Sequence, residues 1–132
     1  MKSFKEYIVE KKVVGLIEFF DIDGIGKVPS KLDSGNGAYN VLHGEDIQTQ
    51  GDKVFFSTVN GKTLLLPKKG EITINFRIGS KEYNNVPFSI GNRTSNLYKI
   101  LVGKDFIEKE LDALIDVSQE NIADKDFEVD YD

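Results

Sequence analysis

The sequence predicts one mostly-β domain, a barrel or a sandwich, with a single short helix near its C-terminal end. The first observation is the alternation of apolar and polar residues in short runs, which is clearest from Ile72 to Ile78. The second is that glycine-containing turns separate these runs, among them Asn60-Gly61. The third is the length of 132 residues, which suits one domain with one core. The sequence shows no internal repeat and no linker that would divide it.

Residues 1–12 are predicted to be an N-terminal extension. Phe4, Tyr7 and Ile8 follow the i, i+3, i+4 spacing of an amphipathic helix, and Ser3 is a suitable N-cap. The pattern therefore favours a helix within the extension, ahead of a barrel over residues 13–118.

The barrel is expected to begin with two strands joined by a turn. Val13 to Phe20 is a run of mostly apolar, β-favouring residues, and the glycines within Asp21 to Gly26 end it. Val28 to Leu32 is predicted to return as the second strand. Because Pro29 has no N–H to donate, this strand should lie at an edge or be irregular there. A loop from Ser34 to Gly37 follows.

The middle of the chain predicts a hairpin and two further strands. Val54 to Val59 and Lys62 to Leu66 flank Asn60-Gly61, and both turn residues tolerate positive φ. Ile72 to Ile78 alternates without a break, and Val86 to Ile90 alternates again. One face of each of these two strands should therefore be buried.

The C-terminal part supplies the helix and a closing strand. Tyr98 to Val102 is largely apolar and stops at Gly103. Asp105 to Leu111 has its apolar residues along one side, which predicts a short helix. Ala113 to Val117 is predicted to be the last strand, and residues 119–132 form an acidic tail.

Composition argues against several classes of function. The net charge of −5 and the pI of about 4.9 disfavour nucleic acid as a partner, because phosphate binding needs a basic face. The chain has no cysteine, which excludes a disulfide framework, a thiol nucleophile and a zinc–thiolate site. No apolar run approaches the ~20 residues of a membrane span, and the N-terminus lacks the apolar core of a signal peptide. We therefore expect a cytoplasmic protein without a membrane partner.

The sequence offers no convincing metal or cofactor site. His43 is the single histidine, so a multi-histidine site is excluded. It could act as a base, but such a residue more often packs or caps a loop. Asp21 to Gly24 starts like a calcium loop, yet the fifth and twelfth places hold Ile25 and Leu32 instead of ligands. A hairpin turn is the better interpretation, and we expect no cofactor.

Two motifs in a fixed order carry the functional signal. The first is Asp33-Ser34-Gly35, which directly follows the apolar Leu32. The second comes about seventy residues later, where Ile100, Leu101, Val102 and Gly103 lead into the short helix. This combination resembles the retropepsin-like aspartic peptidases. The resemblance covers residues 13–118 and implies a closed retropepsin-like β-barrel with one short C-terminal helix.

Other segments extend the resemblance. Asn60 and Gly61 lie where the tip of a flap hairpin would be, and Leu114 to Val117 fits the closing strand. Leu42-His43 makes the chain most similar to the bacterial and phage branch often labelled "ATP-dependent zinc protease". The residues supply no zinc ligand set, so no metal is expected. Any surface hairpin is an equally good interpretation of Asn60 and Gly61.

The resemblance implies a homodimeric aspartic endopeptidase that cleaves a peptide or protein substrate. One copy supplies half of the site, so Asp33 would pair with Asp33 of a second copy across a two-fold axis. Two carboxylates about 3 Å apart cannot both ionise readily, so they share a proton and activate a water together. Ser34 would bond across the dimer, Gly35 would allow a tight turn, and Gly103 would pass beneath the catalytic loop.

Two alternatives stay open. Asn36 stands where the family usually has alanine, and Gly37 and Lys104 replace the acid and the arginine that pair in retroviral members. These departures are compatible with a non-catalytic structural or assembly protein on the same barrel. The other alternative is an unrelated small β-barrel that binds a ligand.

Overall fold

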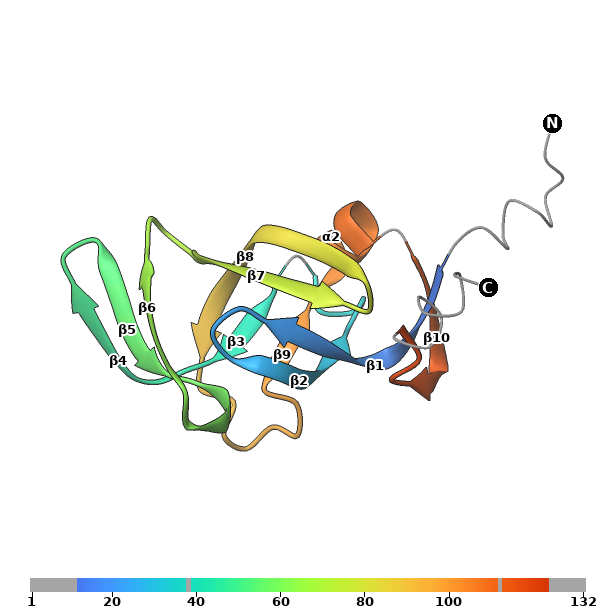
Figure 1. Ribbon diagram of the computed structural model, residues 1–132, viewed down its shortest axis with the longest axis horizontal. Coiled ribbons are helices and arrows are strands. Elements are labelled where there is room, and N and C mark those ends of the chain that lie inside the picture. Colours follow the sequence, from blue (N-terminus) through green and yellow to red (C-terminus); the bar gives the residue numbers. More distant parts are fainter. Residues whose placement is uncertain (1–11, 38, 112, 124–132) are drawn as a thin grey trace, which may run out of the picture.

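The protein is mostly β and contains a closed six-stranded barrel with one short helix near the C-terminus (Figure 1). This computed structural model describes residues 12–37, 39–111 and 113–123. One sheet has the order β10-β1-β2-β9-β3-β8-β7, and additional pairing of β1 with β7 closes it. Its strands are β1 (Lys12–Ile22), β2 (Gly26–Leu32), β3 (Val41–His43), β7 (Ile72–Ile78), β8 (Lys81–Gly91), β9 (Ile100–Val102) and β10 (Ala113–Glu120). The predicted closed barrel is therefore confirmed.

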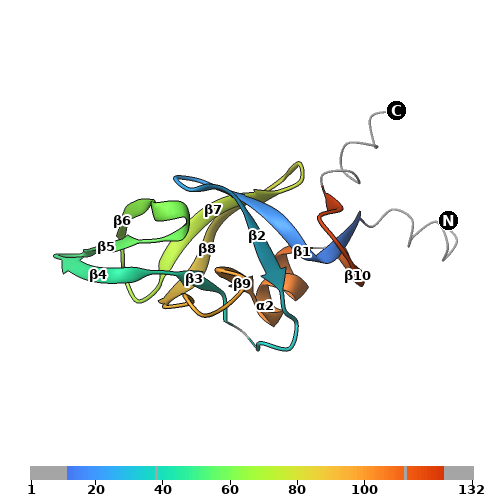
Figure 2. The same cartoon turned by 90° about the horizontal axis from the view of Figure 1, so that it is seen from below.

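A second sheet of three strands continues from the barrel. Its strands are β4 (Glu45–Gln50), β5 (Lys53–Ser57) and β6 (Thr63–Pro67), in that order. Both views place this sheet at the end of the molecule opposite β10 (Figures 1 and 2). The turn η1 (Val59–Gly61) joins β5 and β6. Asn60 and Gly61 have φ of 59° and 70°, so the predicted hairpin is confirmed and its turn uses positive φ as expected.

Alternation along the strands builds the core. In β7 the four apolar residues from Ile72 to Ile78 are buried, as the sequence predicts. At the centre, the Phe76 ring stacks on Phe20 with centroids 4.8 Å apart and lies 5.5 Å from Phe106 of the helix. The helix consists of α2 (Lys104–Phe106) and one π-helical turn, η2 (Ile107–Leu111). It therefore packs on the barrel through residues that the sequence already placed on its apolar side.

Pro29 lies where its missing N–H costs least. It pairs with Phe19 of β1, while β2 pairs with β9 only at Lys31 and Leu32. Across the described strands, the second edge of β2 is thus unpaired at the proline, as predicted.

Strand β10 lies outside the barrel against the first half of β1. The pairing is parallel, from Lys12 opposite Ala113 to Gly15 opposite Asp116. A Cβ on Gly15 would lie 2.4 Å from the carbonyl oxygen of Gln119, so glycine permits the close approach of the two strands. β10 extends to Glu120 and Ala123 is buried, so the acidic tail begins later than the predicted residue 119.

Some sequence predictions were incomplete. Strands β3 and β4 were missed, because β3 has only three residues and every residue of β4 after Glu45 is exposed. The predicted N-terminal helix lies outside the described residues. Of the predicted extension 1–12, the structure describes only Lys12, which belongs to β1. None of the helices in the described part of the chain is long and apolar enough to cross a membrane.

Candidate active site

Asp33 follows the last residue of β2 and begins the loop that leads to β3. Leu32 pairs with Val102 of β9, and the next N–H along the chain, that of Asp33, donates to the Val102 carbonyl at 2.9 Å. The two motifs predicted from the sequence are thus adjacent in space. The side chain of Asp33 is 33% exposed, so solvent or another molecule can reach the carboxylate.

The two carboxylate oxygens of Asp33 have different surroundings. Oδ1 accepts the N–H of Gly35 at 3.0 Å, which closes a small turn within the loop. A Cβ on Gly35 would lie 3.3 Å from this oxygen, so glycine leaves room for the carboxylate. Oδ2 lies 4.0 Å from the ammonium of Lys31, at the outer limit of an ion pair. One oxygen is therefore positioned by the loop, while the other has only a distant charge near it within the described residues.

Ser34 lies at the surface of the loop. The residue is exposed, and its hydroxyl has no hydrogen bond within the described part of the chain. The hydroxyl is free to bond to another molecule. The predicted contact across a dimer stays a prediction.

The segment from Val102 to Lys104 holds the loop from beneath. The N–H of Gly103 donates to Oδ1 of Asn40 at 2.9 Å, and the N–H of Lys104 donates to the carbonyl of Gly37 at 2.5 Å. A Cβ on Gly103 would lie 2.4 Å from the carbonyl oxygen of Tyr39. The close passage expected at Gly103 is present, and no other residue type fits there without a shift of the backbone. Ile100, Leu101 and Val102 are buried and anchor this support in the core.

Asn40 is a site residue that sequence reasoning missed. Its amide is buried, with 7% exposure, and it also donates from Nδ2 to the carbonyl of Pro87 in β8 at 2.9 Å. One side chain therefore ties the loop to both β8 and the end of β9. Nothing in the sequence distinguishes it from Asn36, whose side chain donates, among the described residues, only to the Tyr39 carbonyl inside the loop.

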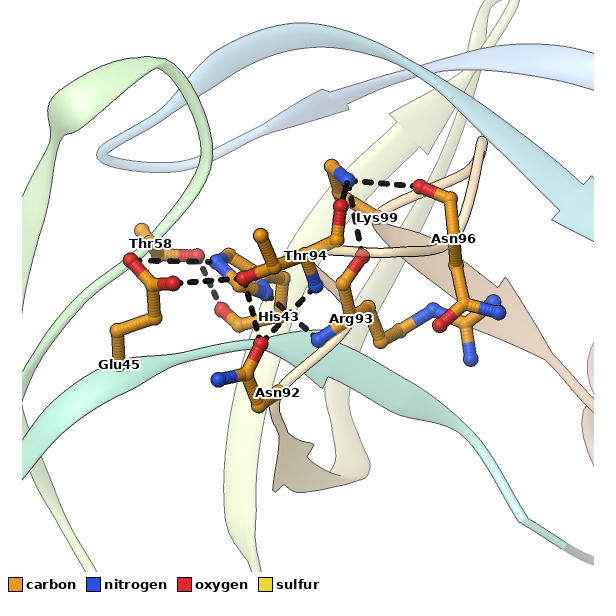
Figure 3. Close-up of polar contacts among 8 residues, drawn as sticks. All are labelled: His43, Glu45, Thr58, Asn92, Arg93, Thr94, Asn96 and Lys99. Atoms are coloured by element: carbon orange, nitrogen blue, oxygen red, sulfur yellow. Dashed lines mark hydrogen bonds and ion pairs between the residues drawn. The ribbon is translucent and has the colours of Figure 1, made fainter.

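His43 caps a loop instead of joining Asp33. It is buried, and its Nδ1 accepts the N–H of Arg93 at 2.8 Å (Figure 3). That acceptor role places the ring proton on Nε2, which lies 3.9 Å from the carboxylate of Glu45. Lys99 completes the network by donating to the carbonyls of Arg93, Thr94 and Asn96 at 2.7–2.9 Å. The packing interpretation of the histidine explains these contacts.

The turn with Asn60 and Gly61 belongs to the same neighbourhood as His43. The hydroxyl of Thr58, just before the turn, donates to the carbonyl oxygen of His43 at 2.6 Å. Within the described residues, no hydrogen bond or ion pair joins this turn to the Asp33 loop. A flap role for the two residues stays a prediction that would require motion or a second copy.

In the described ranges, no three histidine, cysteine, aspartate or glutamate side chains converge to hold a metal ion. The polar groups around Asp33 are one carboxylate, one hydroxyl, backbone amides and the Lys31 ammonium. This set can bind and activate a water or hold a hydrogen-bonding group, but a single carboxylate is half of an aspartic peptidase site.

No family model matches, and no curated protein matches. A solved structure does match, that of the protein Lpg0085 of unknown function (DUF785) from Legionella pneumophila subsp. pneumophila str. Philadelphia 1. The TM-score is 0.72 at 21% identity, over 85% of this chain and 98% of the other. At this identity the likeness establishes a shared fold.

Proposed function

We propose that the protein is a retropepsin-like aspartic endopeptidase that works as a homodimer, with Asp33 of each copy forming the catalytic pair. The observation that supports it is the backbone bond from Asp33 to Val102, which joins the two motifs of the resemblance at one accessible carboxylate. A turn-forming aspartate needs no such support from a distant strand. The supporting segment and the buried Asn40 hold the loop in one conformation, which suits chemistry that depends on position.

The proposed reaction uses the two carboxylates as one unit. They share a proton, because two negative charges a few ångströms apart repel strongly. The ionised carboxylate takes a proton from a water that attacks the peptide carbonyl, and the protonated one donates to the carbonyl oxygen. A proton then passes to the leaving nitrogen as the C–N bond breaks. In this scheme Ser34 bonds to the facing loop, and Gly35 leaves space for its own Asp33.

Replacement of Asp33 by asparagine tests the proposal. The full-length chain and Asp33→Asn would be incubated with a quenched fluorescent peptide library from pH 3 to 8, with Asp52→Asn as the matched control. Asp52 lies in the turn between β4 and β5, outside the site. We expect at least a ~1,000-fold loss of cleavage for Asp33→Asn only, with unchanged unfolding curves. No cleavage by the parent chain at any pH would favour the non-catalytic alternative.

The oligomeric state is the second test. Sedimentation velocity across a range of concentrations should show a dimer in every sample that cleaves, because each copy supplies one carboxylate. A monomer that turns over substrate would contradict the shared site.

A further inference from the structure

A cavity of about 350 Å³ opens beside the candidate site, between the helix, β8 and the catalytic loop. The loop contributes Tyr39 and Asn40, the same segment that begins at Asp33. Tyr39 is 67% exposed, so its ring is available to a ligand. The cavity is thus continuous with the loop on which the proposed chemistry depends.

The walls of this cavity are partly apolar. Val86 and Phe106 line it and are buried at 4% and 2% exposure, and Pro87 lies next to them. The Phe106 ring is fixed by an edge contact with Tyr83, with centroids 5.0 Å apart. Such walls suit the methylene stem of a long side chain.

The charges at the cavity are mostly negative. Among the described residues, Glu71, Asp105 and Glu110 line it, against a single cation, Lys109. The ammonium of Lys109 lies 3.8 Å from the carboxylate of Asp105, so the charges of these two residues offset each other. Glu71 precedes β7 and Glu110 lies in the helix, and neither has an ion-pair partner within the described residues. Two carboxylates from different elements therefore remain unneutralised at one cavity, which attracts a cationic group.

We infer that this cavity binds an arginine or lysine side chain of a peptide, with the stem against Phe106 and the cationic head between Glu71 and Glu110. The choice of a peptide as ligand rests on the proposed function. The preference for a basic side chain rests only on the cavity and its charges. If the protein is a peptidase, this cavity would set a preference for a basic residue near the cleaved bond.

The test uses two peptides of nearly the same shape and different charge. Acetyl-Ala-Ala-Arg-Ala-Ala-amide and its citrulline counterpart would be titrated into ¹⁵N-labelled Asp33→Asn chain and followed by amide NMR shifts. This background prevents cleavage, so the result is independent of whether the protein is a peptidase. We expect shifts centred on Asn40, Phe106 and Glu110 with the arginine peptide, and at least ~5-fold weaker binding of the citrulline peptide.

A matched pair of variants locates the charge effect. Glu71→Gln with Glu110→Gln should weaken binding of the arginine peptide by about tenfold or more, because two attractions are lost. Glu108→Gln with Glu120→Gln removes the same charge at exposed positions outside the cavity and should leave binding unchanged. Equal binding of the two peptides, shifts elsewhere on the protein, or equal effects of the two double variants would overturn the inference. If the protein proved not to be a peptidase, the same binding results would still be expected.

Discussion

The backbone N–H of Asp33 donates a hydrogen bond to the carbonyl oxygen of Val102 over 2.9 Å. The two residues are far apart in the sequence and meet because β2 and β9 are parallel neighbours. The bond places an accessible carboxylate next to the end of β9.

Gly103→Ala should destabilise the protein by about 1–3 kcal/mol, because its Cβ would collide with backbone that has little room to move. The colliding atoms are the carbonyl oxygens of Tyr39 and Gly37, at 2.4 and 2.7 Å. Urea unfolding measures the change. Gly91→Ala is the control, since its Cβ would meet only the side chain of Val41 at 3.2 Å. Equal stability of both variants would contradict the close packing.

Asn40→Ala should cost about 1–3 kcal/mol, because the Gly103 N–H and the Pro87 carbonyl lose their partner. Asn40→Asp retains an acceptor for Gly103 but loses the donor to Pro87, so its cost should differ from that of alanine. Thermal unfolding of both variants checks this. Asn36→Ala, in the exposed part of the same loop, should change stability by less than either.

Glu18→Gln should destabilise the protein by about 1.5–3 kcal/mol. Its carboxylate is buried and accepts three backbone N–H groups, from Gly15 at 2.6 Å and from Ile122 and Ala123 at 3.0 Å. An amide in either orientation sets an NH₂ donor against at least one of these donors. Hydrogen exchange should show faster exchange at residues 121–123 in the variant. Unchanged protection there would contradict the anchoring role.

Ser118→Ala should raise the pKa of Asp116 towards its ordinary value of 3.8. The Ser118 hydroxyl bonds to that carboxylate at 2.6 Å and is the largest cause of a pKa lowered in the folded protein, followed by the Gln119 amide. Because the pKa of Asp116 is lower in the folded protein than in the unfolded chain, its ionised form stabilises the fold at pH values above the unfolded-state pKa. This contribution is lost as the pH falls through the folded-state pKa. Carboxyl ¹³C NMR titration measures the shift. An Asp116 that titrates identically in both proteins would contradict it.

Local patterns in the sequence determined much of the architecture. Alternation from Ile72 to Ile78 predicted a buried strand face, and Asn60-Gly61 predicted the hairpin, because both depend on neighbours along the chain. The order of the two motifs predicted that Asp33 and Gly103 belong together. These patterns left a barrel or a sandwich open, and the resemblance carried by the two motifs implied the closed barrel that the structure shows.

Tertiary structure alone decided which buried polar side chains hold the Asp33 loop and the segment after β10 in place. Asn40 and Glu18 gain their roles from backbone groups that lie 63 and 105 residues away along the chain. Strand β4 exists through its pairing with β5, because it has almost no apolar pattern of its own. The cavity with Glu71 and Glu110 likewise requires the segment before β7, strand β8 and the helix to converge. The periodicity of apolar side chains can be read directly from the sequence, because it depends on neighbours along the chain. Hydrogen bonds between distant segments, and the grouping of charges from different segments, depend on how the barrel closes.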